Sequence, residues 1–234
     1  ASVRNVGCAT SVIAGIEHVL KAHDQVIVIE DDIVTHPETL GFLNAALHEY
    51  RATPAVFSVA AWAPPYAVAR ADYPYNAYFF PRFHCWGWAT WRDRWARNDW
   101  EVPHYDEYVA NGFLRRAHER GGRDLPSMLA AQMEGRIDSW AVRAEYTRFL
   151  NGGVTLYPRS SLVLNIGMDG SGRHCSASKR YGATLPAERP YDHLPFPRHI
   201  CVDDEIEQRF RRIYQPSSIA RRVFARLKRA SGLG

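Results

Sequence analysis

The sequence feature that says most about the fold is a short apolar run that ends abruptly in three acids. Residues 25–29 read Gln-Val-Ile-Val-Ile, and Glu30, Asp31 and Asp32 follow at once. A β-branched run without a polar break is typical of a strand buried on both faces, as in a parallel sheet. The sequence therefore predicts a central strand over 25–29 with carboxylates at its carboxyl end.

The segments around this strand predict an α/β fold. Apolar residues at helical spacing over 10–22 indicate a helix before it. A helix-start signal at Thr35, with Pro and Glu behind it, opens a helical pattern that continues to Arg51. Residues 55–61 are predicted as the next strand. This alternation predicts a mostly parallel sheet flanked by helices, in which ligands bind at the carboxyl ends of the strands.

Further elements are expected along the rest of the chain. Helices are predicted over 124–134 and 138–150, each opening on an Asp at the N-cap position. Strands are predicted over 78–80, 154–157 and 161–164.

Composition excludes several classes of protein. With 46% hydrophobic and 23% charged residues in a chain of 234, the balance is typical of one large globular domain. The chain has no internal period of the kind seen in repeat proteins, and no apolar run reaches the roughly 18–20 residues of a membrane-spanning helix. The four Cys, at 8, 85, 175 and 201, form no C-x-x-C pair, so they favour free thiols in a reducing cytosol over a zinc ribbon.

Positive charge is concentrated at the carboxyl end. Eight Lys and Arg residues and no acids follow Glu207, and without these eight the formal net charge changes from +4 to −4. Over 219–229 apolar and basic residues alternate at helical spacing, which predicts an amphipathic helix at an anionic membrane surface. A solvated terminus is the alternative. The tail has one Phe, so we expect no nucleic-acid partner, and a cytoplasmic protein at the inner face of the cell membrane.

The acidic triplet is the first candidate site. Three consecutive carboxylates repel one another unless a cation lies among them. Mn²⁺ and Mg²⁺ prefer oxygen ligands, usually one or two carboxylates together with substrate phosphates. Glu30, Asp31 and Asp32 therefore predict a divalent-metal site, with a solvated turn at the end of the strand as the alternative.

A glycine-rich segment over 165–174 is the second candidate. Its glycines allow a ligand to approach the backbone closely, and Arg173 and His174 have side chains suited to phosphate. Asp169 and His174 also belong to the residue types that bind metals. A plain connecting loop is the alternative.

Aromatic residues form the third candidate, since five of the seven Trp fall between 86 and 100. Exposed indole rings bind the apolar faces of sugars, whereas buried ones belong to the core. We expect a core role for most of them, and Trp86 and Trp88, which flank Gly87, are the candidates for an exposed platform. Asp138 is a fourth candidate, as a general base, although the local sequence favours an N-cap role for it.

Several longer strings resemble bacterial glycosyltransferases of the GT-A fold, which transfer sugars in lipopolysaccharide and capsule synthesis. They lie in fixed order over residues 1–176: Asn5–Gly7, Ile27–Ile33 with His36 and Pro37, Cys85–Trp91, Ile137–Arg143, Leu156–Pro158 and Asn165–Gly172. More distantly, the acidic triplet and residues 58–62 and 79–81 resemble the N-acetylglucosaminyltransferase that begins complex N-glycans.

This resemblance implies roles for the triplet and for a base. Asp32 would bind the Mn²⁺ or Mg²⁺ that sits on the diphosphate of a nucleotide-sugar donor, with His174 as a further metal ligand. Glu30 and Asp31 would lie near the nucleotide and the donor sugar. Asp138 falls where such enzymes place the catalytic base, and Asp124 or Glu134 are the alternatives.

The same resemblance implies a substrate-binding role for two other segments. Trp86, Gly87 and Trp88 would lie near the donor or acceptor sugar. The glycine-rich segment would close over the diphosphate, with Asn165, Gly167, Asp169, Gly170 and Arg173 as its binding residues.

The resemblance also implies a domain organisation. Residues 1–176 would form a GT-A domain with a Rossmann-like, mostly parallel sheet, followed by a Pro-rich extension over 177–208 and a basic amphipathic tail over 209–234. Relatives begin with a strand and loop that hold the nucleotide base. This chain starts near the helix that follows them, so we expect an N-terminally truncated domain.

The expected function is that of a metal-dependent, inverting glycosyltransferase. It would move a sugar from a nucleotide-diphosphate sugar to a glycan or a lipid-linked saccharide acceptor in surface polysaccharide synthesis. Two other classes stay open: a sugar nucleotidyltransferase, and a non-catalytic carbohydrate-binding module built on the Trp cluster.

Overall fold

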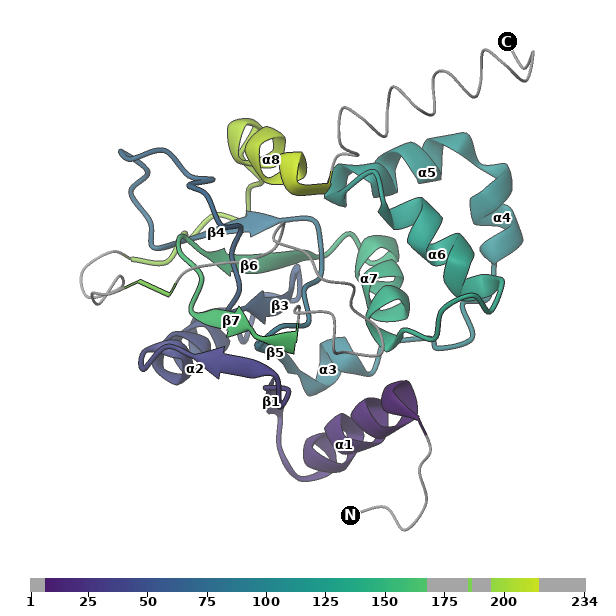
Figure 1. Cartoon of the computed structure of the whole chain (residues 1–234), viewed down its shortest axis with the longest axis horizontal. Coiled ribbons are helices and arrows are strands. Elements are labelled where there is room, and N and C mark those ends of the chain that lie inside the picture. The colour runs from purple at the N-terminus through teal and green to yellow at the C-terminus, as the bar shows by residue number, and fades with distance from the viewer. Residues whose placement is uncertain (1–6, 168–184, 187–194, 215–234) are drawn as a thin grey trace.

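The computed structural model describes residues 7–167, 185–186 and 195–214, which form a mixed α/β fold (Figure 1). Its elements in chain order are α1 (Cys8–Ala22), β1 (Gln25–Val28), β2 (Ile33–Thr35), α2 (Thr39–Glu49), β3 (Val56–Ala60), β4 (Ala77–Phe80), β5 (Trp88–Trp91), α3 (Arg92–Trp95), α4 (Tyr105–Ala110), α5 (Gly112–His118), η1 (Glu119–Gly121), α6 (Leu125–Met133), α7 (Trp140–Leu150), β6 (Val154–Pro158), β7 (Val163–Asn165), α8 (Asp204–Phe210) and η4 (Arg211–Tyr214).

The central sheet has five strands in the order β1-β5-β3-β6-β4. Only β3 and β6 pair in parallel, while β1 with β5, β5 with β3, and β6 with β4 are antiparallel. The expected mostly parallel sheet is therefore wrong for the described strands. The apolar run over 25–29 does form β1, but among the described strands it pairs with the antiparallel β5 alone, which separates it from the parallel pair. β1 is thus an edge strand and not the central, doubly buried one expected, and only its Val26 is buried. An apolar run does not record the direction of the neighbouring strand.

The strand directions nevertheless place several carboxyl ends together. Because β5 runs opposite to both of its neighbours, β1 and β3 point the same way, and β6 runs with β3. The carboxyl ends of β1, β3 and β6 thus meet at one edge of the sheet. A separate antiparallel pair, β2 with β7, continues the chain from β1 at that edge.

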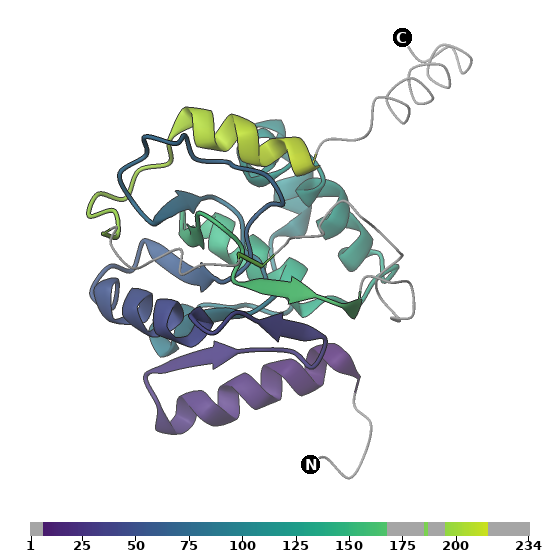
Figure 2. The same cartoon turned by 60° about the vertical axis from the view of Figure 1, so that its left-hand side comes forward.

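Helices cover both faces of the sheet. On one face α2 packs against β3, β4 and β5, and Tyr50 at its end contacts Phe79. The largest apolar cluster also includes α8, whose Phe210 contacts Tyr78, Phe80 and Tyr157 on the opposite face, the one that carries Trp88. On this second face α1 and α7 pack against Val26 and Trp88. Strand alternation explains this division, since Trp88 faces the second cluster while Ala89 and Trp91 face the first. Figures 1 and 2 show α1 and α8 at opposite ends of the molecule, with the sheet between them.

A helical lobe beyond α7 forms a third cluster. Tyr108, Leu129, Val142 and Tyr146 are buried there between α4, α6 and α7. Figure 1 shows α4, α5 and α6 gathered on this side of the sheet.

Helix starts differ from the sequence prediction in three places. Thr35 ends β2, and α2 begins four residues later, with Glu38 at the cap position but no side-chain cap. Asp124 precedes α6 without capping it, because its carboxylate pairs with Arg82 at 2.8 Å. Ser139, and not Asp138, caps α7 by accepting a hydrogen bond from the amide of Val142.

The C-terminal described segment belongs to the main core. Phe210 stacks on Phe80 with ring centroids 3.9 Å apart, and the Arg82 guanidinium lies 3.5 Å from the ring of Tyr214. The expected domain boundary between residues 208 and 209 falls inside α8. In the part of the chain that the structure describes, no helix combines the length and apolar character needed to cross a bilayer.

Candidate functional site

The acidic triplet forms the turn that joins the two sheets. Glu30 closes this turn by accepting a hydrogen bond from the amide of Ile33 at 3.2 Å, so Asp31 and Asp32 are its central residues. Asp31 is exposed, whereas Glu30 and Asp32 are half-buried. The sequence thus correctly predicts carboxylates at the carboxyl end of β1.

Charge in this turn is not compensated. Burial, and then the neighbouring charges of Asp32 and Asp31, raise the pKa of Glu30 to about 6. No ion pair to any of the three acids occurs within residues 7–167, 185–186 and 195–214 (cation and carboxylate within 4.0 Å). The turn therefore holds negative charge that the described cations do not neutralise.

Asp32 lies directly against the start of the glycine-rich segment. Its carbonyl accepts a hydrogen bond from the amide of Ile166 at 2.9 Å. A Cβ atom on Gly167 would lie only 2.5 Å from Asp32 Oδ2, so a larger residue there would displace the carboxylate. The antiparallel pairing of β2 with β7 thus brings together two candidates that are more than 130 residues apart in sequence.

Asn165 shapes this junction from within. Its side-chain oxygen accepts a hydrogen bond from the amide of Gly167 at 2.8 Å, which turns the backbone back toward the triplet. Asp169, Gly170, Arg173 and His174 lie outside the described residues.

Asp138 directly precedes Ser139, the N-cap of α7. Its carboxylate is 68% exposed and accepts a hydrogen bond from Arg143 at 3.2 Å. Burial and the charges of Glu30, Asp138 and Asp31 together raise the pKa of the Cys8 thiol, at the start of α1. The Cys8 thiol thus lies within electrostatic range of Glu30, Asp31 and Asp138. Of the two alternative bases, Asp124 is engaged with Arg82 and Glu134 with Arg136, at 2.6 Å.

Cys8 is a site neighbour that sequence reasoning missed. In the sequence it is one of four thiols with no distinguishing pattern, and its exposed position at the start of α1 follows from the packing of α1 on α7. No local signal in the sequence marks it.

The expected aromatic platform divides into a buried and a half-buried part. Trp88 is only 1% exposed and packs on Phe83, Trp95 and Trp140, so the expected exposed role is wrong for it. Trp86 is half-buried and lies two residues before Trp88, the first residue of β5, which pairs with Val28 at the carboxyl end of β1. Gly87 has φ +60°, and a Cβ atom there would lie 2.9 Å from Val163 Cγ1, so packing against β7 explains this glycine.

The rings of Trp62 and His84 pack against Trp86. The Trp62 and His84 rings stack at 4.1 Å, and Trp86 meets Trp62 edge to face at 5.9 Å. Burial, and then the charge of Arg82, lowers the pKa of His84 well below its usual range, so the imidazole is neutral at pH 7. His84 has no recognisable sequence signal, whereas Trp62 directly follows the predicted strand over 55–61.

The donor atoms of the turn suit a divalent cation. Asp32 Oδ1 is buried and has no hydrogen-bond partner among the described residues. Mg²⁺ and Mn²⁺ commonly take one or two protein carboxylates and complete their shells with water and phosphate oxygens. A group of three or more metal-binding side chains is not found in the described part of the chain. The turn therefore fits a cation held jointly with a ligand, and His174 lies outside the described residues.

Comparison with known proteins adds no family assignment. No protein-family model matches this chain, and no curated protein sequence matches it either.

Proposed function

We propose that the chain is a metal-dependent glycosyltransferase that uses a nucleotide-diphosphate sugar and a glycan or lipid-linked saccharide acceptor. The observation that carries the proposal is the unpartnered Asp32 carboxylate, held against Gly167 at the carboxyl end of β1. A buried carboxylate oxygen without a donor is costly unless a cation or a ligand satisfies it. The sequence resemblance supplies the reaction class, and GT-A is the fold proposed within the observed mixed α/β architecture.

Asp32 would hold Mn²⁺ or Mg²⁺ in this proposal. When bound, the cation neutralises charge that builds on the departing diphosphate. Glu30 would contact the donor sugar. Although burial and the neighbouring carboxylates raise its pKa to about 6, it is mostly ionised at neutral pH and accepts hydrogen bonds from sugar hydroxyls.

Asp138 would act as the base. Its carboxylate is exposed, so it is free to meet an acceptor hydroxyl, and its only described ion-pair partner is Arg143 at 3.2 Å. Removal of the hydroxyl proton by Asp138 would activate the oxygen for attack on the anomeric carbon, with inversion of configuration. Trp86, on its support of Trp62 and His84, would offer an indole face to a sugar ring.

The other two classes have less support. A carbohydrate-binding module on the Trp cluster loses Trp88 to the core. The sequence resemblance to glycosyltransferases is what favours that class over a nucleotidyltransferase. The cytoplasmic face of a membrane remains the proposed location, and the basic segment over 219–229 lies outside the described residues.

Calorimetric titration of UDP, GDP and CMP, each with and without Mn²⁺, tests the donor site. We expect one nucleotide to bind only with Mn²⁺, and Asp32→Ala to abolish that binding and turnover. Asp106→Ala, which removes an exposed acid on α4, is the matched control and should bind as the parent does. Metal-independent binding, or full activity of Asp32→Ala, would contradict the proposal.

The base is tested separately. Asp138→Asn should lower turnover about 100-fold or more while leaving nucleotide binding unchanged. Ser139→Ala is its neighbour control, since loss of the α7 cap should cost about 1 kcal/mol of stability without touching the acceptor. An unchanged rate for Asp138→Asn would remove Asp138 from this role.

A further inference from the structure

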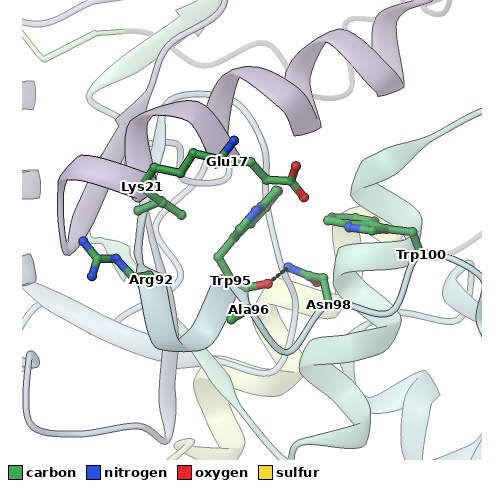
Figure 3. A pocket seen from close by; sticks show the side chains of 8 residues that line it. Glu17, Lys21, Arg92, Trp95, Ala96, Asn98 and Trp100 are labelled. Atoms are coloured by element: carbon green, nitrogen blue, oxygen red, sulfur yellow. Dashed lines mark hydrogen bonds between the residues drawn. The ribbon is translucent and has the colours of Figure 1, made fainter.

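A pocket between α1 and the segment that follows β5 is separate from the acidic turn. Its cavity of about 430 Å³ is lined by Glu17, Leu20, Lys21, Arg92, Trp95, Ala96, Asn98 and Trp100 (Figure 3). This volume lies within the range of small-molecule sites in proteins, about 300–1,000 Å³. At 1.5 Å per residue, Lys21 lies about 20 Å along α1 from Cys8, the helix end that faces the acids.

Two Trp rings form one wall of the pocket. The Trp95 and Trp100 rings have centroids 5.1 Å apart and are tilted by 55°. Trp95 is 6% exposed and Trp100 is half-buried. Figure 3 shows the Glu17 carboxylate between the two rings, with Lys21 and Arg92 on the other side of the pocket. An apolar ring face edged by polar groups is the chemistry that binds a sugar ring.

Two buried polar atoms in this wall lack partners within the described residues. They are Trp95 Nε1, which is a donor, and Asn98 Oδ1, which is an acceptor. Asn98 uses its amide nitrogen on the carbonyl of Trp95 at 2.9 Å, which fixes the orientation of its oxygen. Because both atoms are covered, a ligand reaches them only after a small rearrangement of the exposed side chains around them. A hydroxyl group, which both donates and accepts, satisfies either atom.

Charge in the pocket is balanced, which selects for an uncharged ligand. Arg92 pairs with Asp24 at 3.2 Å, and Lys21 and Glu17 carry opposite charges one helical turn apart. An anion would gain Lys21 but would meet the Glu17 carboxylate. An apolar ligand would leave Trp95 Nε1 and Asn98 Oδ1 unsatisfied.

We propose that this pocket is a second, non-catalytic binding site for a neutral saccharide. A ring would stack on Trp100, and its hydroxyls would bond to Glu17, Lys21 and the unpaired atoms of Trp95 and Asn98. This site does not depend on the proposed transferase chemistry, because it contains none of the acids of the turn.

Saturation-transfer NMR on the full chain tests the proposal, with EDTA present and no nucleotide. The probes are the methyl glycosides of glucose, galactose, mannose, rhamnose and N-acetylglucosamine, each at about 20 mM, since single sugars bind in the millimolar range. At least one should give ring-proton signals. Trp100→Ala should reduce them at least about five-fold, and Glu17→Ala, on the exposed face of α1, should weaken binding at least about three-fold.

Matched controls separate this pocket from other surfaces. Phe113→Ala, which removes a ring that is 72% exposed on α5, should leave the signals unchanged, as should Asp32→Ala. Loss of signal in Asp32→Ala would assign the binding to the acidic turn and overturn the proposal. Silence from all five glycosides, binding of inorganic sulfate only, or signals that survive in both pocket variants would also overturn it.

Discussion

Two carboxylates taken out of water behave in opposite ways in this molecule. Burial alone would raise the pKa of Glu145 in α7, but the Arg148 guanidinium and, behind it, His118 lower it to about 2. Glu30 at the end of β1 has no such partners, so burial and the nearby Asp32 and Asp31 raise its pKa to about 6. The Glu145 carboxylate is thus compensated by a cation, whereas the Glu30 carboxylate lies beside two further negative charges.

The surroundings of Glu145 explain the difference. Both of its oxygens accept from Arg148, at 2.7 and 2.9 Å, and one also accepts from the amide of Phe83. His118 lies 3.6 Å away and bonds to Tyr108 through its other ring nitrogen. This network joins the helical lobe to the sheet and leaves the Glu145 oxygens well satisfied. The acidic turn has the reverse character, which marks it as a place for a ligand and not for a structural ion pair.

The largest expected effect comes from breaking the satisfied network. Glu145→Gln leaves Arg148, which is 2% exposed, without its counter-charge. We expect a loss of about 3–5 kcal/mol in the free energy of unfolding, measured by urea denaturation. Glu134→Gln, in an exposed pair with Arg136, is the control and should cost less than about 1 kcal/mol. Equal losses in the two variants would remove the distinction between the two kinds of carboxylate.

Binding of Mn²⁺ at the acidic turn should have the next largest effect on the stability of the fold. Mn²⁺ at about 100 times its dissociation constant should stabilise the fold by about 2.7 kcal/mol, because it binds the native turn and not the unfolded chain. The shift in Tm is the readout, and Asp32→Asn should lose it while Asp106→Asn keeps it. If Asp32→Asn responds to Mn²⁺ as the parent does, the cation binds elsewhere.

The pH dependence of Glu30 should give the smallest effect. Its folded pKa of about 6 lies above the ordinary value of 4.5, so the ionised group destabilises the fold above pH 6, and this penalty disappears as the pH falls through 6 toward 4.5. The full shift corresponds to about 2 kcal/mol, and solvent around the half-buried carboxyl reduces this to about 1 kcal/mol.

Glu30→Gln should therefore be more stable than the parent at pH 7.5 and equal to it near pH 4.5. Urea midpoints at three pH values check this. Glu145 behaves oppositely: its contribution is present above pH 4.5 and is lost only as the pH falls toward 2. A variant that is less stable than the parent at pH 7.5 would show that Glu30 already has a compensating partner.

The sequence predicts the individual helices and strands, and the acidic turn, better than it predicts which strands pair with one another. The helix over 10–22, a strand within 25–29 and the carboxylates at its end are confirmed, because periodicity is a property of the segment itself. Burial on both faces is wrong for this strand, since only Val26 of β1 is buried and β1 lies at the edge of the described sheet. The antiparallel position of β5 depends on pairing between distant segments, which no local pattern records. The parallel sheet was predicted wrongly for this reason.

Side-chain roles at helix starts divide in the same manner. Asp138 and Ser139 are both good N-caps, and only the backbone conformation decides that Ser139 performs the role. Because Ser139 caps the helix, the Asp138 carboxylate is exposed and free of the N-cap role that the local sequence favoured for it. Likewise, Trp86 and Trp88 look equivalent around Gly87, but strand alternation buries Trp88 among the rings of α3 and α7.

The packing of α8 has a consequence for any shortened version of the chain. β4 is an edge strand of the described sheet, and Phe210 lies flat on its Phe80 while also contacting Tyr157. A chain that stops at residue 176 would uncover these rings beside an unprotected strand edge, which is a surface prone to self-association. A shortened version that keeps these rings covered should therefore extend through Tyr214.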